Sequence, residues 1–254
     1  MQQLPLAVRL RASAVFDSFV AGPNAEIVDL LERLAPRPHA PLVWLYGPAG
    51  VGRTHLLQAV CARAGERQRR AAYVPLREFA AAGPEALAGL EVLDFICLDD
   101  FDAVAADPAW VRAVFGLFIA LQDAGGRLLI AAAASPRASG IELPDFVSRA
   151  AGGAVLKLRP LTEDQQLEAL RRRAAQRGLV LSPAVARFLQ LRLPRDTATL
   201  CAAVDALDEA SLAAGRRLTL PFVRTFVERM AVGGGAAGSV AGADHSRDER
   251  VSRR

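Results

Sequence analysis

The chain has 254 residues, of which 52% are hydrophobic and 23% are charged, and its formal net charge is +4. That length and apolar content allow one sizeable core and a smaller domain, and they exclude disorder for most of the chain. No apolar run reaches the roughly 20 residues that span a bilayer. The N-terminus shows no apolar signal region, so we expect a cytoplasmic protein without membrane contacts.

The cysteine and lysine content indicates the redox compartment of the protein and the kind of cation available for a phosphate site. Cys61, Cys97 and Cys201 are far apart and lack metal-ligand spacing, which favours a reducing compartment over disulfides or zinc, with Cys61 and Cys97 as buried thiols. Lys157 is the single lysine, so an arginine could stand where other phosphate sites use lysine. No basic stripe with interleaved aromatic residues occurs, so we expect no direct sequence-specific DNA binding.

Strands and helices alternate over the first 160 residues. Residues 1–12 form a short arm, and residues 16–34 predict a turn followed by a helix. Strands are expected over 42–47, 71–76, 92–100, 127–134 and 154–158, with helices over 53–65 and 110–126. This order is typical of an α/β domain, here residues 13–160, whose parallel sheet is covered by helices on both faces.

Only helical patterns follow Pro160. Helices are expected to start at a capping box, Thr162–Gln165, and at Ser182-Pro183, and to cover 196–214 and 220–230. These patterns predict a small all-helical domain over residues 161–230. The Gly-rich and then charged residues 231–254 predict a disordered tail.

One segment has the pattern of a phosphate-binding loop. Residues 47–54, GPAGVGRT, fit the phosphate-loop pattern G-x-x-x-x-G-K-[ST], except that Arg53 replaces the lysine. The glycines let successive backbone N–H groups face a phosphate, and the helix that follows adds its positive N-terminal end. Thr54 offers a hydroxyl to Mg²⁺, and Asp99 and Asp100 end a strand where a metal-holding acid and a water-orienting acid are expected.

Several segments together resemble one family. FDSFVAGPNAE, GPAGVGRTHLLQAV, LDDFDAV, LPDFVSR and the helical region after them are similar to the AAA+ module of the DnaA family, most closely to its regulatory Hda branch. The resemblance implies a P-loop AAA+ sheet with a helical lid domain. It also implies binding of ADP or ATP, with Mg²⁺ at the phosphates. The implied partners are DnaA and the sliding clamp, the beta subunit of DNA polymerase III.

The resemblance also assigns roles to residues. Asp99 would hold the metal together with Thr54, and Asp100 would orient water. His55 either approaches the phosphates or lies on the helix surface. Arg53 at the lysine position favours the Hda branch. The implied nucleotide-binding residues are Phe19, Val20 and Gly22 near the adenine, and Gly47, Pro48, Ala49, Gly50, Val51, Gly52, Arg53, Thr54 and His55 near the phosphates.

Arg149 in LPDFVSR matches the family's arginine finger, which reaches a γ-phosphate bound by a neighbouring molecule. Taken alone, Arg149 would more simply pair with Asp145 on the surface of a helix. Two departures weaken hydrolysis in the protein's own site. Ala133 stands at the polar sensor position, and Ala198 stands at the second sensor, with Arg195 nearby as a substitute. We therefore expect weak ATPase activity without a partner.

Residues 2–6, Gln2, Gln3, Leu4, Pro5 and Leu6, resemble a shortened form of the family's clamp-binding peptide. An ordinary N-terminus with two apolar residues is the alternative, and the resemblance leaves a homodimer open. Two functions remain in competition. The first is a regulator that switches DnaA off by stimulating its ATP hydrolysis, and the second is a self-hydrolysing AAA+ ATPase acting as a helicase or clamp loader.

Overall fold

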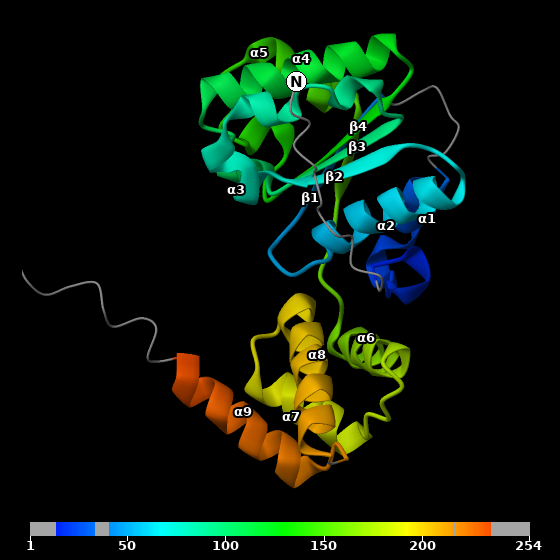
Figure 1. The fold of residues 1–254 in the computed structure, drawn as a ribbon, viewed down its shortest axis with the longest axis vertical. Helices are drawn as coiled ribbons and strands as arrows, with labels where there is room; N and C mark the ends of the chain where they lie inside the picture. The colour runs from blue at the N-terminus through cyan, green and yellow to red at the C-terminus, as the bar shows by residue number, and fades with distance from the viewer. Residues whose placement is uncertain (1–13, 34–40, 216, 235–254) are drawn as a thin grey trace, which may run out of the picture.

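A computed structural model describes residues 14–33, 41–215 and 217–234, which form an α/β part above a cluster of helices (Figure 1). The sheet has five parallel strands in the order β2-β3-β4-β1-β5. The strands are β1 (Leu42–Tyr46), β2 (Ala71–Pro75), β3 (Phe95–Asp99), β4 (Arg127–Ala132) and β5 (Ala154–Lys157). The expected α/β class and parallel sheet are confirmed.

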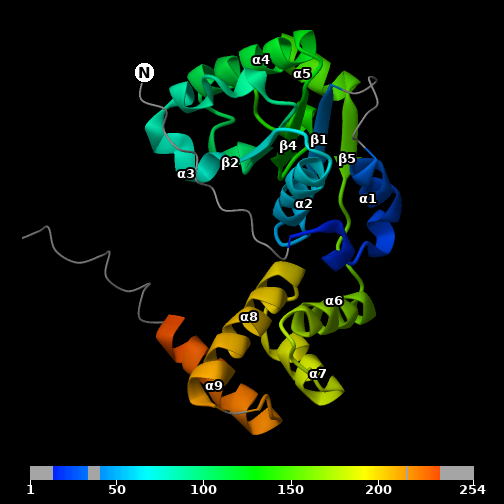
Figure 2. The ribbon, with the colours of Figure 1, turned by 45° about the vertical axis from the view of Figure 1, so that its right-hand side comes forward.

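Helices cover both faces of the sheet (Figure 2). One face packs against α1 (Ala25–Glu32) and α2 (Arg53–Glu66), and the other packs against α3 (Leu76–Phe79), α4 (Pro108–Asp123) and α5 (Pro144–Gly152). Successive residues of a strand point to opposite faces. Trp44 therefore enters the core under α4, while Leu45 enters the core under α2. Burial on both faces explains why the strands are continuous apolar runs.

The helical part has its own core. Its helices are α6 (Glu163–Gln176), α7 (Pro183–Arg192), α8 (Thr197–Ala214) and α9 (Leu220–Gly234). The Thr162 hydroxyl accepts a bond from the Gln165 N–H, and the Gln165 side-chain oxygen accepts one from the Thr162 N–H, so the expected capping box is confirmed. Ser182 caps α7 with Pro183 in its first turn. Leu170, Leu189, Leu200 and Val204 meet in the core between these helices.

Several boundaries differ from the expected ones. β3 begins at Phe95 rather than residue 92, because Leu90–Val92 form a 3₁₀ turn that leaves Val92 58% exposed. α4 begins at Pro108 and ends at Asp123, rather than covering 110–126, since the Asp107 carboxylate accepts from the Ala109 N–H and caps the helix. β4 stops at Ala132, and α9 extends to Gly234. The short helix α3 was not anticipated, because four residues show no clear period, and α5 was anticipated only as the helix on which Arg149 could pair with Asp145.

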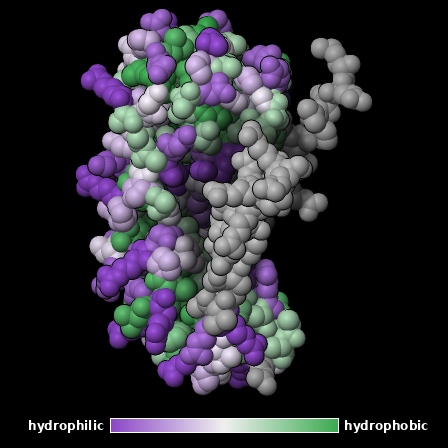
Figure 3. All heavy atoms as spheres, turned by 90° about the vertical axis from the view of Figure 1, so that its left-hand side faces the viewer, coloured by the Kyte–Doolittle hydropathy of each residue, from purple (hydrophilic) through white to green (hydrophobic). Residues whose placement is uncertain are grey.

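The buried thiols Cys61 and Cys97 and the packed Trp44 agree with expectation. The expected arm, residues 1–12, and residues 235–254 of the expected tail lie outside the described residues. Within the described residues, no helix combines the length and apolarity that crossing a membrane requires. On the face drawn in Figure 3, hydrophilic side chains are spread over both the α/β part and the helical part.

Candidate functional site

The loop between β1 and α2 has the conformation that its glycines permit. Gly50 and Gly52 have φ values of +72° and +102°, in a region where side-chain-bearing residues are strained. A Cβ at Gly52 would lie 2.5 Å from the Phe19 ring, and a Cβ at Gly50 would lie 2.6 Å from the Cβ of Asp196. The glycines are therefore needed both for the turn and for the close approach of two other segments.

A cavity of about 230 Å³ opens between this loop, the N-terminal segment and the helical part. It brings together residues as far apart in the sequence as Ala14 and Asp205. The predicted nucleotide-binding residues that line it are Phe19, Val20, Gly50, Val51, Gly52, Arg53, Thr54 and His55. Gly47, Pro48 and Ala49 belong to the same loop but do not line the cavity. Gly22 lies instead against Leu161 and Gln165.

His55 fastens the N-terminal segment to the start of α2. Its Nε2 lies 3.1 Å from Ser18 Oγ and 2.9 Å from the Val15 carbonyl oxygen. Its ring also lies 5.3 Å from the Phe19 ring, centroid to centroid. His55 thus holds Phe19 at the cavity wall, which is a role that neither sequence alternative described.

The helical part contributes a charged wall to the cavity. Arg173 on α6 donates two bonds to the Asp205 carboxylate on α8, at 2.6 and 2.5 Å, and Arg177 adds a third at 2.8 Å. Burial pushes the pKa of Asp205 up, but the bonds and charges of the two arginines outweigh it and lower the pKa overall. Burial also raises the pKa of the neighbouring Cys201 to about 11, so its thiol stays protonated.

The two residues considered for the second sensor, Ala198 and Arg195, lie in different places relative to the cavity. Ala198 lines the cavity, whereas Arg195 is exposed and pairs with Glu163 at 3.1 Å. Arg195 therefore lies outside the cavity. Arg173 is the cation that the helical part brings to the cavity, and no motif in the sequence indicated it.

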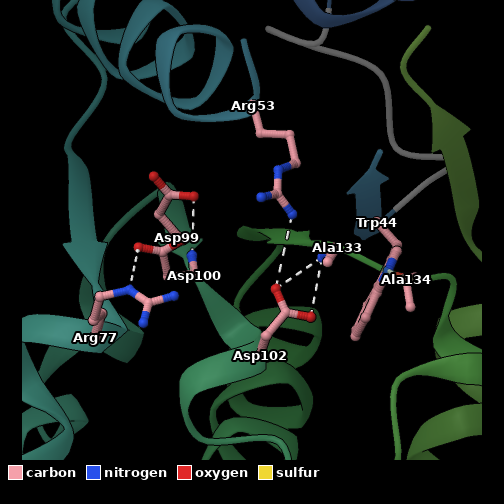
Figure 4. Close-up of polar contacts among 8 residues, drawn as sticks. All are labelled: Trp44, Arg53, Arg77, Asp99, Asp100, Asp102, Ala133 and Ala134. Atoms are coloured by element: carbon pink, nitrogen blue, oxygen red, sulfur yellow. Dashed lines mark hydrogen bonds and ion pairs between the residues drawn. The ribbon is translucent and has the colours of Figure 1, made fainter. Parts of the chain in front are cut away.

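Asp99, the last residue of β3, and Asp100, which follows it, lie in different surroundings (Figure 4). Asp99 is buried and accepts bonds from the Tyr73 hydroxyl at 2.8 Å and from the Asp100 N–H at 2.9 Å. Burial and the Asp99 carboxylate raise the pKa of Tyr73, which keeps its hydroxyl protonated and donating. Asp100 has a left-handed backbone, with φ +52°, and its carboxylate accepts from Arg77 Nε at 3.2 Å.

Arg53 extends from the start of α2 across the strand ends toward Asp102 (Figure 4). Its side chain is 14% exposed, and its Nη1 lies 3.8 Å from Asp102 Oδ2. That nitrogen is buried and has no hydrogen-bond partner among the described residues. An unsatisfied buried donor costs about 1–3 kcal/mol, and more when it is charged. The Arg53 guanidinium thus has capacity for an anion such as a phosphate.

Asp102 is a site residue that the sequence reasoning missed. Its two oxygens accept from the Ala133 N–H at 3.0 and 2.8 Å, which fixes the carboxylate at the end of β4. A third acid after Asp99 and Asp100 was the only available signal, and it did not say which way the side chain would point.

Arg149 lies on α5, is exposed, and does not line the cavity. The described residues contain no ion pair between Arg149 and Asp145, so the surface pairing considered from sequence is not formed. The guanidinium is free to meet another molecule. The described residues hold no group of three His, Cys, Asp or Glu side chains that could bind a metal ion.

The comparisons with known proteins identify the family. A family model for the bacterial DnaA ATPase domain matches residues 10–151, which is more than half of the chain. The chain belongs to the bacterial DnaA ATPase family. A second model, for the lid domain of Hda, matches residues 163–227. The DnaA-type α/β domain is thus followed by a lid of the Hda type, and the AAA+ fold expected from the sequence is confirmed.

Solved structures agree with the fold of this DnaA family member. Domain III of the Thermotoga maritima replication initiation protein DnaA matches with a TM-score of 0.73 and 20% identity, covering 87% of this chain and 98% of that one. The AMPPCP-bound DnaA from Aquifex aeolicus matches with a TM-score of 0.66 and 21% identity, covering 78% of this chain and 66% of that one. At these identities the likeness establishes the fold.

Proposed function

We propose that this DnaA family member regulates replication initiation by binding ADP or ATP and stimulating ATP hydrolysis by DnaA. One observation carries the proposal. The DnaA ATPase module is joined to a lid of the Hda type, and its finger candidate, Arg149, is exposed and lies outside the protein's own cavity. An arginine placed in this way can act on a partner's nucleotide and does not face its own.

Nucleotide binding is supported by the cavity and by the chemistry of the loop. The loop glycines allow backbone N–H groups to face phosphates, and the buried Arg53 nitrogen lacks a hydrogen-bond partner. The solved Aquifex aeolicus DnaA carries AMPPCP. Phe19 would contact the base, with Val20 beside it. Gly22 would act more remotely, through its contact with Leu161.

The oxygen atoms of Thr54 and Asp99 are suitable ligands for Mg²⁺. Thr54 is exposed at the loop, and each Asp99 oxygen accepts one bond, which leaves a further lone pair on each oxygen. Mg²⁺ is commonly held by one or two protein groups together with phosphates and waters. Thr54 and Asp99 would hold the ion, which would neutralise phosphate charge.

Hydrolysis in the protein's own site is expected to be slow. Ala133 and Ala198 have no side-chain donor for a γ-phosphate, and Arg195 is paired with Glu163. Asp100 is drawn toward Arg77 rather than left to orient water. Losing a single donor that stabilises transition-state charge costs about 3–4 kcal/mol, so two such losses leave little turnover.

In the proposed action, Arg149 enters the ATP site of a DnaA molecule and stabilises the charge that develops on the transferred phosphoryl group. Arginine fingers supply about 10³–10⁵ in rate in well-studied GTPases. Gln2, Gln3, Leu4, Pro5 and Leu6 would tether the protein to the DNA-loaded sliding clamp.

A self-hydrolysing ATPase, such as a helicase or clamp loader, is the second candidate. The observation in its favour is the buried acid Asp99, held in a defined orientation by the Tyr73 hydroxyl. Multiple-turnover hydrolysis by the purified protein alone, without DnaA or clamp, would favour this second candidate and contradict the first.

The deciding experiment measures hydrolysis of DnaA-bound ATP in the presence of clamp loaded on DNA. Wild-type protein is compared with Arg149→Ala and with Arg112→Ala, a matched loss of an exposed arginine on α4. We expect Arg149→Ala to lose stimulation by about a hundredfold or more, and Arg112→Ala to retain it. Equal stimulation by wild type and Arg149→Ala would refute the finger assignment. Undiminished stimulation after deletion of residues 2–6 would refute the tether.

A further inference from the structure

Asp102 occupies a central position at the strand ends. It lies in the 3₁₀ turn Phe101–Ala103, directly after β3, and both of its oxygens accept from the Ala133 N–H at the end of β4. The same carboxylate lies 3.8 Å from the buried Nη1 of Arg53. Figure 4 shows the Asp102 carboxylate facing both the Arg53 guanidinium and the Ala133 N–H, with Asp99 and Asp100 to one side.

The two groups that Asp102 contacts are the ones that an additional phosphate would need. In phosphate loops of this pattern, the side chain at the position of Arg53 reaches the β- and γ-phosphates. A backbone N–H at the end of a neighbouring strand is a second donor for an anion. Here one carboxylate faces the guanidinium and takes the N–H, so it competes with an incoming anion for both.

We propose that Asp102 determines which nucleotide the site prefers, favouring one that ends at the β-phosphate over one that carries a γ-phosphate. A diphosphate can be held by the loop N–H groups and by the side of the Arg53 guanidinium turned away from Asp102. A third phosphate would bring further negative charge toward the Asp102 carboxylate, or would have to displace it from Arg53 and Ala133. The inference rests on the nucleotide binding proposed above, and it adds the residue that selects among nucleotides.

The test removes the negative charge of Asp102 and keeps the shape of its side chain. In Asp102→Asn the amide oxygen can still accept from the Ala133 N–H, so the turn after β3 is retained. ADP and AMPPCP are titrated calorimetrically into the full chain in EDTA, so that no metal ion masks the phosphate charge. We expect the variant to bind AMPPCP about tenfold more tightly than wild type, with ADP changing much less, because a charge a few ångströms away near a protein surface is worth at least that factor.

Asp123→Asn is the matched control. It removes the same charge from an exposed position at the end of α4, and we expect it to leave the ratio of the two dissociation constants unchanged. If thermal unfolding shows that Asp102→Asn is misfolded, Asp102→Ser supplies a smaller uncharged acceptor at the same position.

The outcomes separate the two proposals. A ratio of AMPPCP to ADP dissociation constants that stays at the wild-type value in the folded variant overturns the role of Asp102 while leaving nucleotide binding intact. An equal gain for both nucleotides also overturns it, because Asp102 would then oppose phosphate in general. Wild-type protein that binds neither nucleotide overturns the nucleotide binding under "Proposed function", and this inference with it.

Discussion

Asp205→Asn should destabilise the lid selectively. Asp205 is 22% exposed and accepts two bonds from Arg173, which is 15% exposed, and one from Arg177. Removing the Asp205 charge leaves Arg173, which is largely but not fully buried at the cavity, without a full counterion. Hydrogen bonds to charged groups contribute about 1.5–3 kcal/mol each, and breaking a buried ion pair costs about 3–5 kcal/mol.

The expected loss is about 3 kcal/mol, because the asparagine oxygen retains part of the bonding and the pair is not fully buried. For a unit the size of the lid, each kcal/mol moves the unfolding temperature by about 4–8 °C, so the lid should unfold at least about 10 °C lower. Both tryptophans, Trp44 and Trp110, lie in the α/β domain. Tryptophan fluorescence therefore reports unfolding of the α/β domain only. Unfolding of the lid is measured as a loss of helical circular dichroism at temperatures where the fluorescence has not yet changed.

The control is Glu168→Gln. Glu168 pairs with Arg172 at 2.9 Å on the same helix, and both side chains are about half exposed. Such exposed pairs contribute about 0.3–0.5 kcal/mol, so the control should unfold close to wild type. If Asp205→Asn lies within about 0.5 kcal/mol of Glu168→Gln, the cross-helix pairs do not stabilise the lid as reasoned.

Three further predictions concern the site and pH. Tyr73→Phe removes a donor from the buried Asp99 carboxylate and should lower the free energy of unfolding by about 1–3 kcal/mol in urea; an unchanged midpoint would contradict a stabilising bond. Gly52→Ala places a Cβ against Phe19 at φ +102° and should weaken ADP binding about tenfold, as measured by titration; unaltered affinity would contradict the tight approach. Because folding lowers the pKa of Asp205, its stabilisation is present above the pKa of the unfolded chain and is lost as the pH falls through the lower folded pKa. Wild type should therefore lose more lid stability on acidification than Asp205→Asn, and parallel losses would argue against the shift.

Sequence patterns predicted those features of the fold that depend only on residues close together in the chain. The capping residues Thr162 and Ser182 start the helices that they were expected to start, because a cap bonds to N–H groups within three residues. The apolar runs at 42–47 and 127–134 were recognised as strands because a short apolar run bounded by turn residues is itself a local pattern. Helix α5 was anticipated only through the spacing of Asp145 and Arg149, since nine residues give too little period to define the bounds of a helix.

What the sequence by itself determined is the phosphate loop, the alternation of strands and helices, and the DnaA-family resemblance that the family models bear out. Only the tertiary structure decided the surroundings of the loop. The strand order places β4 between β1 and β3, which brings the Ala133 N–H to Asp102, 31 residues away, and both to Arg53. Similarly, the packing of α6 on α8 brings Arg173 to the cavity and leaves Arg195 outside it. These contacts depend on which elements become neighbours when apolar surface is buried. The periodicity of one segment predicts its secondary structure but not which other segments will pack against it.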